Sequence, residues 1–323
     1  MKVSCAFPPG PDVVAHAVLA ESLGYERVWL YDSPALYPDV WVHLARVAEH
    51  TGRIGLGPAV LIPSLRHVLT QASAIATLEG LAPARTVAAV GTGFTGRMAL
   101  GQAPLPWHEV ESYVRTLRAL LRGEQVEVDG SVVQMIPPAG YLPAPPIGVP
   151  ILVAANGPKG LRIAAELGDG VMTIGSGQPD FAWCAVLAFG TVLDDGESPS
   201  SRRALEAAGP ALTVVYHGMY EASPAALDSL PGGPEWRAGL DEVPATVRHL
   251  AVHEDHLVRV TERDTPLLDG DTLAAFTWTG PAAALRHRLD ELEVSGGTEI
   301  LYAPMGLDIA RELRAFAAMA GIA

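Results

Sequence analysis

The sequence predicts an α/β protein whose fold is a (β/α)8 barrel, and three observations support this class. Short apolar segments typical of buried strands alternate with helical patterns along most of the 323 residues. The connections are short, which favours parallel strands joined by right-handed helical crossovers. Eight parallel strands are expected, more than a doubly wound sheet needs, and the chain is long enough for a barrel of about 250 residues with insertions.

The first part of the chain contains four β/α units in succession. Gly24 and Gly52 follow two of the expected helices, and glycine readily takes the left-handed conformation that is common after a helix end. The expected strands are 2–7, 27–31, 53–62 and 86–90, and the expected helices are 13–23, 40–50, 67–81 and 107–121.

The second part departs twice from this alternation. A hairpin is expected at 125–135, with Asp129-Gly130 at its turn, and helical pieces dominate between 221 and 278. The other expected strands are 151–154, 170–174, 211–216 and 299–302, and the other expected helices are 159–167, 181–193, 281–292 and 308–320. We therefore expect one domain, 1–323, with insertions at about 123–148 and 221–278.

Composition excludes several classes of protein. The formal net charge of -14 disfavours a nucleic acid or an anionic membrane as partner, because the field of the whole protein would repel phosphate. Cys5 and Cys184 form no disulfide framework and no zinc spacing, which is typical of a reducing compartment. No signal-peptide segment and no apolar run of about 20 residues is present. We expect a cytoplasmic protein that acts on a small molecule.

In a barrel of this kind the chemistry takes place where the strands end. The expected strand ends lie around Asp32, Ala59, Gly91, Ala154, Ile174, Tyr216 and Ala303.

A glycine-rich segment, 91–96, follows the fourth strand. It matches G-x-G-x-x-G, but three β/α units precede it and no acidic strand end follows it, so a Rossmann dinucleotide site is not favoured. Glycines at a strand end still let backbone N–H groups approach an anion closely, and Arg97 adds a fixed positive charge. This segment is a candidate seat for a phosphate.

A second candidate seat follows the fifth strand. Pro158 suits the first position of a helix, and the free N–H groups of that first turn lie beside Lys159. The same residues would also suit the start of an ordinary helix that binds no anion. Two such seats on neighbouring strand ends would hold a phosphate between them.

Three histidines, His249, His253 and His256, are spaced as on one face of a helix. That spacing could supply imidazoles to a metal, but the H-E-x-x-H pattern is absent and a barrel metal site would use several strands. A solvated or pocket-facing helix is favoured, and no metal is expected. Hydrolase chemistry is poorly supported, because the chain lacks a G-x-S-x-G segment and a Cys/His nucleophile pair.

The third expected strand carries a resemblance to a known family. The segment 53–60, Arg-Ile-Gly-Leu-Gly-Pro-Ala-Val, followed by Pro63 and Arg66-His67, resembles the third-strand signature of the bacterial luciferase-like superfamily. More narrowly, it resembles the coenzyme F420-dependent oxidoreductases, including methylene-tetrahydromethanopterin reductase. Comparable segments occur at 90–93, 155–159, 168–171 and 297–300.

The resemblance implies a barrel that binds a flavin or deazaflavin at the carboxyl ends of its strands. It implies a cis peptide bond between Ala59 and Val60, which would place the backbone against one face of the ring. The implied cofactor-binding residues are Pro58, Ala59, Val60, Gly91, Thr92, Gly93, Arg97, Ala154, Ala155, Asn156, Gly157, Pro158, Lys159, Ile174 and Gly175.

The second strand departs from the family pattern. Relatives often end it with Asp-His or Glu-His, whereas this chain has Asp32-Ser33. A serine hydroxyl has too high a pKa to act as a general acid near neutral pH, so a proton would come from another group or from water. The candidate catalytic residues are Asp32, Ser33, His253 and His256, and the candidate substrate-pocket residues are Tyr37, Trp41, Trp107, His217 and Trp278, with Trp183 as a further wall.

Three functional hypotheses follow. The first is an F420-dependent reductase that transfers a hydride to an activated C=C or C=N bond. The second is a reduced-FMN monooxygenase on the same fold, and the third is a non-catalytic flavin-binding protein. The third-strand segment and a local group of cations, Arg66, Arg97, Lys159 and Arg162, favour F420, whose glutamyl tail is polyanionic. The apolar helices 40–48 and 68–81 would allow a homodimer.

Overall fold

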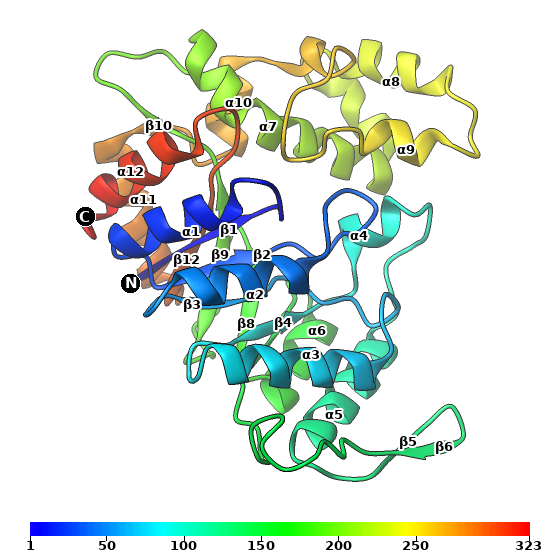
Figure 1. Cartoon of the computed structure of the whole chain (residues 1–323). Helices are drawn as coiled ribbons and strands as arrows, with labels where there is room; N and C mark the ends of the chain where they lie inside the picture. The colour runs from blue at the N-terminus through cyan, green and yellow to red at the C-terminus, as the bar shows by residue number, and fades with distance from the viewer.

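Eight parallel strands wind into a barrel in the computed structural model, which describes all residues from 1 to 323 (Figure 1). Around the sheet they run β3-β2-β1-β12-β9-β8-β7-β4. Bridges between Leu56 and Thr86 and between Leu61 and Val90 bring β3 against β4, so the barrel is nearly closed. The strands are β1 (Lys2–Phe7), β2 (Arg27–Leu30), β3 (Gly55–Pro58), β4 (Ala88–Val90), β7 (Ile151–Ala154), β8 (Gly170–Ile174), β9 (Cys184–Phe189) and β12 (Glu299–Ala303). The predicted fold class is confirmed.

Helices flank the barrel because its strands are apolar on both faces. The larger core lies between strands and helices, where side chains such as Leu30, Leu44 and Ile75 are fully buried. Side chains of alternate strand residues, including Ala6, Trp29 and Leu301, form a smaller cluster inside the barrel. The flanking helices are α1 (Val13–Ser22), α2 (Val40–His50), α3 (Val68–Leu81), α4 (Phe94–Met98), α5 (Trp107–Leu121), α6 (Pro158–Leu167), α11 (Ala282–Val294) and α12 (Ile309–Ala320).

The seventh strand lies elsewhere than the sequence predicts. Residues 181–193 do not form the expected helix, because β9 pairs with β8 on one side and β12 on the other. Residues 211–216 do not form the expected strand, because they lie inside α7 (Arg202–Ala222), and Tyr216 is therefore not at a strand end. The six apolar residues of β9 are too short a run for periodicity to separate strand from helix. The β-branched residues of α7 are helical because Ser201 caps the helix and one face is buried.

A helical insertion occupies the chain between β10 (Val192–Leu193) and β11 (Gly280–Pro281), two short strands that pair with each other. It has its own core, which includes Leu212, Tyr216 and Trp236. Figure 1 shows it as a layer across one end of the barrel, with α9 above α4. Besides α7 it contains the 3-10 helix η1 (Pro224–Ser229), α8 (Gly233–Asp241), α9 (Arg248–Val252), the 3-10 helix η2 (Thr265–Leu267) and α10 (Gly270–Phe276).

The hairpin is confirmed as β5 (Val126–Val128) and β6 (Ser131–Val133). Asp129 and Gly130 both have positive φ, 52° and 76°, as a tight two-residue turn requires. Among all the helices, none combines the length and the apolar character needed to cross a membrane.

The end of the barrel opposite the insertion is closed by a buried polar cluster around Glu299, the first residue of β12. Its fully buried carboxylate accepts hydrogen bonds from Ser4 (2.5 Å), Arg27 (2.7 Å) and the Trp183 indole (2.8 Å). The Arg27 guanidinium also lies 4.5 Å from the centre of the Trp183 ring. Trp183 therefore belongs to the floor of the barrel and not to a substrate pocket.

We expect Glu299→Ala to lower the free energy of unfolding by about 3–5 kcal/mol, because Arg27 would lose its buried partner. Chemical denaturation monitored by circular dichroism measures the change. Glu293→Ala, which removes an exposed carboxylate paired with the N-terminal amine, serves as the control and should cost less than about 1 kcal/mol. Equal losses for the two variants would contradict a special role for the floor cluster.

Candidate functional site

The glycine-rich segments meet at the rim of the barrel. β4 pairs with β7 and β7 pairs with β8, so Gly91, Ala155 and Gly175 follow three adjacent strand ends. The two predicted seats are therefore neighbours in space. The residues of this rim are partly open to solvent, and the Ile174 side chain is 60% exposed although it is apolar.

Gly93 cannot be replaced without moving its neighbours. Its φ of 81° lies in the left-handed region, and a Cβ atom there would lie 2.6 Å from Cγ2 of Ile62. A Cβ atom at Gly91 would lie 3.0 Å from Val60. Both glycines are buried against residues that follow β3, and the Gly91 N–H donates to the Leu61 carbonyl (3.1 Å).

Asn156 fixes the shape of the second seat. Its amide donates to the Ile174 carbonyl (2.7 Å) and its carbonyl oxygen accepts from the Ile174 N–H (3.2 Å). This reciprocal pair joins the β7–α6 loop to the end of β8. Next to it, added Cβ atoms at Gly157 and Gly175 would meet nothing within 4 Å, so this part of the rim borders open space.

The peptide bond between Ala59 and Val60 is cis, as the resemblance implies. It follows Pro58, the last residue of β3, and both residues are half-buried at the rim. The segment Pro58–Val60 therefore lies beside Gly91 at the same edge of the barrel.

Only two of the four cations expected at the site are free of carboxylates. Arg66 pairs with Asp32 and Asp39, and Arg162 pairs with Glu166 and Glu111. Arg97 instead donates to the Ala103 carbonyl (2.6 Å) and to the Ser64 hydroxyl (2.5 Å). Lys159 is exposed in the first turn of α6. The positive charge left for a bound anion thus comes from Arg97 and Lys159.

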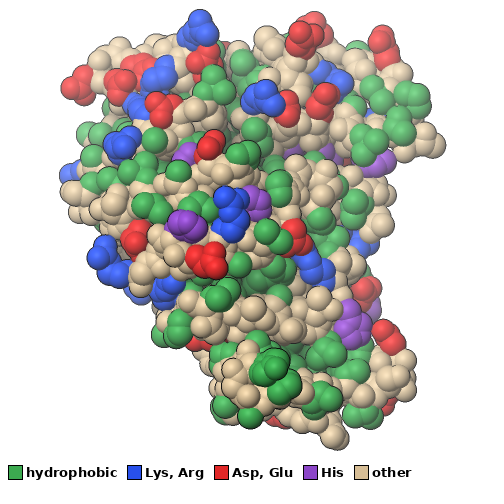
Figure 2. Space-filling view, in the orientation of Figure 1, with side chains coloured by type: hydrophobic (Ala, Val, Ile, Leu, Met, Phe, Trp, Pro, Cys, Tyr) green, Lys and Arg blue, Asp and Glu red, His purple; other side chains and the backbone are tan.

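No large basic surface is visible on the face shown in Figure 2. Lysine and arginine side chains are interspersed there with aspartate and glutamate. The charges of both signs are therefore mixed on this face of the molecule.

A cavity of about 480 Å³ lies between the insertion and the rim. Its wall is formed by three parts of the chain: the β2–α2 loop with Tyr37, the residue Ala99 that follows α4, and α9 with the loop after it. The last part contributes Leu250, His253 and His256. Three of the predicted pocket and catalytic residues thus meet around one space. The Tyr37 hydroxyl donates to the His256 carbonyl (2.5 Å), and burial raises its pKa above the usual range.

Asp32 and Ser33 follow β2, shortly before the residues of the same loop that line the cavity. Asp32 is buried, and its carboxylate accepts a hydrogen bond from Arg66 at 2.6 Å. Burial raises the pKa of Asp32, while Arg66 opposes that rise. Ser33 is half-buried beside Gly96, where an added Cβ atom would lie 3.2 Å from its hydroxyl oxygen. The contact between Arg66 and Asp32 was not predicted, because it joins loops that are 34 residues apart.

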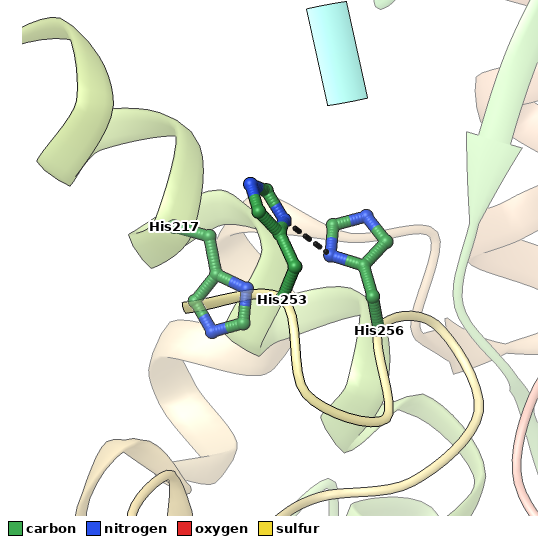
Figure 3. A group of neighbouring side chains, drawn as sticks. All are labelled: His217, His253 and His256. Carbon is green, nitrogen blue, oxygen red and sulfur yellow. Dashed lines mark hydrogen bonds between the residues drawn. The ribbon is translucent and has the colours of Figure 1, made fainter. Parts of the chain in front are cut away.

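The three histidines that meet in space are not the three that the spacing predicts. α9 ends at Val252, so the helical face expected for His249, His253 and His256 does not exist, and the His249 ring lies over Gly101. His217 from α7 joins His253 and His256 in its place (Figure 3). Burial lowers the pKa of His217, and burial with its two imidazole neighbours lowers that of His256 well below its usual value. Neutral rings are therefore favoured at these two positions.

The predicted tryptophan walls do not line this cavity. The Trp41 indole donates to Gln71 (2.8 Å) and so joins α2 to α3. Trp107 packs against Gly160 of α6, and Arg288 lies 4.4 Å from the centre of the buried Trp278 ring. All three side chains hold helices against the barrel, which is the commoner role of large aromatic residues.

The arrangement was compared with known proteins. The model of the luciferase-like monooxygenase family matches residues 6–299. The chain belongs to this family. The match spans the barrel from β1 to β12, so the resemblance seen in the third strand is confirmed for almost the whole chain.

Two curated relatives of this luciferase-like protein are named for reductive or oxidative chemistry. The F420-dependent glucose-6-phosphate dehydrogenase of Beutenbergia cavernae is 36% identical over 189 residues, 52% of this chain and 54% of the relative. The 5,10-methylenetetrahydromethanopterin reductase of Methanolobus tindarius is 32% identical over 190 residues, 56% of either chain. The alignments thus span about half the length of these relatives.

Solved structures share the luciferase-like fold along the whole chain. The coenzyme F420-dependent tetrahydromethanopterin reductase from Methanopyrus kandleri is 20% identical, with a TM-score of 0.71 and 98% of both chains covered. The oxygenating constituent of 3,6-diketocamphane monooxygenase from Pseudomonas putida, in complex with FMN, is 14% identical, with a TM-score of 0.60 and 100% of this chain and 96% of that chain covered.

We expect Tyr37→Phe to loosen the loop that follows α9. The change leaves the buried His256 carbonyl without its donor, at a cost of about 1–3 kcal/mol. Hydrogen exchange should become faster at residues 253–258, and the melting temperature should fall. Tyr141→Phe, at a side chain that is 78% exposed, is the control and should change neither.

Proposed function

We propose that this luciferase-like protein is an F420-dependent oxidoreductase that transfers a hydride between F420 and a small organic substrate. We expect the reaction to be the reduction of an activated C=C or C=N bond. The observation that carries the proposal is the 36% identity to an F420-dependent dehydrogenase, together with membership of the family. When bound, the deazaflavin would donate or accept the hydride, and the protein would bind and orient the reactants.

The rim residues fit such a cofactor. Gly157 and Gly175 are exposed and border open space, so N–H groups of that loop can approach a phosphate. The Gly91 N–H instead donates to the Leu61 carbonyl and holds the neighbouring strand end in place. Arg97 and Lys159 supply positive charge that no carboxylate of the chain neutralises. We assign the phosphorylated side chain of the cofactor to this segment of the rim and its ring to the neighbouring segment 58–60.

The cavity under the insertion supplies the substrate side. Tyr37, His253 and His256 lie in its wall, and Asp32 and Ser33 precede the lining residues of the β2–α2 loop in sequence. The imidazole rings of His253 and His256 and the hydroxyl of Tyr37 can orient a small polar molecule in the cavity. The insertion covers the cavity and limits the access of water. A proton for the product would come from Tyr37, His217, His253 or His256, or from water, since Ser33 replaces the histidine that relatives often have.

The second candidate is a reduced-FMN monooxygenase. The name of the family model and the FMN complex of the Pseudomonas putida enzyme favour it. Both cofactors carry a phosphorylated side chain, so the rim fits either one. The glutamyl tail of F420 is the chemical difference, and exposed Lys159 at the outer edge of the rim favours the more anionic cofactor.

The domain organisation, the cellular compartment and the oligomeric state are also proposals. We propose a single domain in a reducing, cytoplasmic setting, since Cys5 and Cys184 are both free and buried. We propose a homodimer through the outer faces of α2 and α3, where Val42 is 60% exposed and Leu81 is 45% exposed. Small-molecule chemistry requires no nucleic-acid or membrane partner.

Titration of the purified full chain with F420 and with FMN, followed by fluorescence quenching, tests the proposal. We expect saturable binding of F420 and, with reduced F420 and a panel of enones and imines, oxidation of the cofactor measured by absorbance. Binding of FMN without binding of F420 would select the monooxygenase. Binding of F420 without turnover of any acceptor would select a non-catalytic protein.

Two substitutions of Gly157 that differ in charge but not in size test whether an anion binds at this part of the rim. Asp and Asn are both good helix caps, and a side chain has room at this position, so Gly157→Asp and Gly157→Asn should both fold. We expect the Asp variant to bind F420 at least about tenfold more weakly than the Asn variant, equivalent to about 1.4 kcal/mol, because it repels the anionic tail. Equal affinities in a fluorescence titration would place the anion elsewhere.

A further inference from the structure

Three histidines are buried together above the barrel rim, and two of them line the cavity assigned to the substrate. His217 lies on α7, His253 caps the end of α9, and His256 lies in the following loop. One ligand atom from each lies within 4.8 Å of the others, and all three side chains are at most 4% exposed. Figure 3 shows the rings gathered around a common point.

The distance between two of the rings matches a metal site better than a hydrogen bond. The Nδ1 atoms of His253 and His256 are 3.4 Å apart, which is long for a good N–H···N bond. Two nitrogens at about 2.0–2.1 Å from a tetrahedral zinc ion lie about 3.3–3.4 Å apart. The third ligand atom needs to approach by no more than about 1.5 Å to complete the same face.

Carboxylates lie behind two of the three rings. Asp264 lies 3.5 Å from Nε2 of His217, at the limit of a hydrogen bond. Glu221 lies 3.6 Å from Nε2 of His253, slightly beyond that limit, so a small shift would bring it into hydrogen-bond contact. A carboxylate behind an imidazole holds the proton on that nitrogen and turns the lone pair of the other nitrogen toward a metal. Nδ1 of His217 has no hydrogen-bond partner, although it is buried.

Neighbouring side chains fix both the carboxylate and the ring. Asp264 accepts hydrogen bonds from the Trp236 indole (2.7 Å) and the Thr261 hydroxyl (2.9 Å), and Trp236 also stacks on His217 with an interplanar angle of 14°. The loop around His256 is held in an unusual shape, because Asp255 and Leu257 on either side both have positive φ, 51° and 60°. The three nitrogens are therefore positioned before any ligand binds.

We propose that His217, His253 and His256 form a binding site for a divalent transition metal such as zinc, with a fourth position open to the cavity. His253 and His256 line that cavity, so water or an oxygen or nitrogen atom of the substrate supplies the fourth ligand. Glu254 and Asp255 lie in the same wall and add negative charge. The inference stands apart from the proposed F420 chemistry, because metal binding is measured without cofactor or substrate.

Titration of the chelator-treated full chain with Co²⁺ and Zn²⁺ tests the site. We expect saturation at one equivalent of Co²⁺ per chain with the intense visible absorption of tetrahedral cobalt, and displacement of that cobalt by Zn²⁺. Absence of saturable binding, or only the weak absorption of octahedral cobalt, would overturn the proposal.

Variants locate the metal. His217→Ala, His253→Ala and His256→Ala should each weaken zinc binding at least about 100-fold in competition with a chromophoric chelator. His249→Ala is the matched control, because His249 lies on α9 just before His253 but its ring lies over Gly101. The affinity of this variant for zinc should not change. Equal affinity in the His253 and His249 variants would overturn the site.

A substitution next to the three histidines, rather than of a histidine itself, tests the site even if an alanine variant fails to fold. Glu221→Gln leaves all three imidazoles in place and should weaken zinc binding about 10–100-fold, with an unchanged circular dichroism spectrum. Zinc should raise the melting temperature of the unaltered protein and should raise it less in Glu221→Gln. An equal rise in both proteins would contradict the role assigned to Glu221.

Azide added to the cobalt-loaded protein tests the open position. A shift of the visible bands is expected, because azide can replace a water ligand but not a protein ligand. Unchanged bands at saturating azide would overturn the open fourth position.

Discussion

The structure depends on continuous parallel hydrogen bonding around eight strands, because this constraint places every strand end at one rim. β1 pairs with β2 and β12, and the remaining strands follow in turn until β3 and β4 meet through two isolated bridges. Parallel strands cannot be joined by tight turns, so each connection returns along the outside as a helix. The strand end at Gly91 and the loop at Asn156 are neighbours for this reason, although 65 residues separate them.

The two ends of the barrel therefore have different chemistry. At the floor, Glu299 is fully buried and each of its partners is a side chain of the barrel wall or its edge, which leaves no polar atom for a ligand. At the rim, Gly157 and Gly175 border open space, and Ile174 is exposed although it is apolar. A polar group that is satisfied internally stabilises the fold, whereas exposed backbone N–H groups and apolar side chains at a concave edge provide a binding surface.

The sequence could predict the barrel and most of its first half because local signals and tertiary structure agree there. Val40–His50 and Trp107–Leu121 have clear helical periodicity, and the helices observed have the same bounds. It could not predict β9, since six apolar residues rich in Ala fit either element and only pairing with β8 and β12 decides. The rim residues followed from strand ends and a family resemblance. The packing of Trp41, Trp107 and Trp278 could not be predicted, because the sequence does not distinguish a tryptophan that lines a pocket from one that packs between helices and barrel.

The histidine cluster shows where reasoning from spacing fails. The i, i+4, i+7 pattern has meaning only if the helix continues, and α9 ends before His253. The third member comes from α7, 36 residues before His253, in a segment whose β-branched residues favour a strand over a helix. The cluster lies on the insertion and the cavity lies between the insertion and the rim, whereas the glycine-rich seats lie on strand ends. Because the insertion has its own core around Tyr216 and Trp236, its cavity-facing residues can differ between relatives without disturbing the rim. The function proposed above thus assigns substrate choice and cofactor binding to separate parts of one fold.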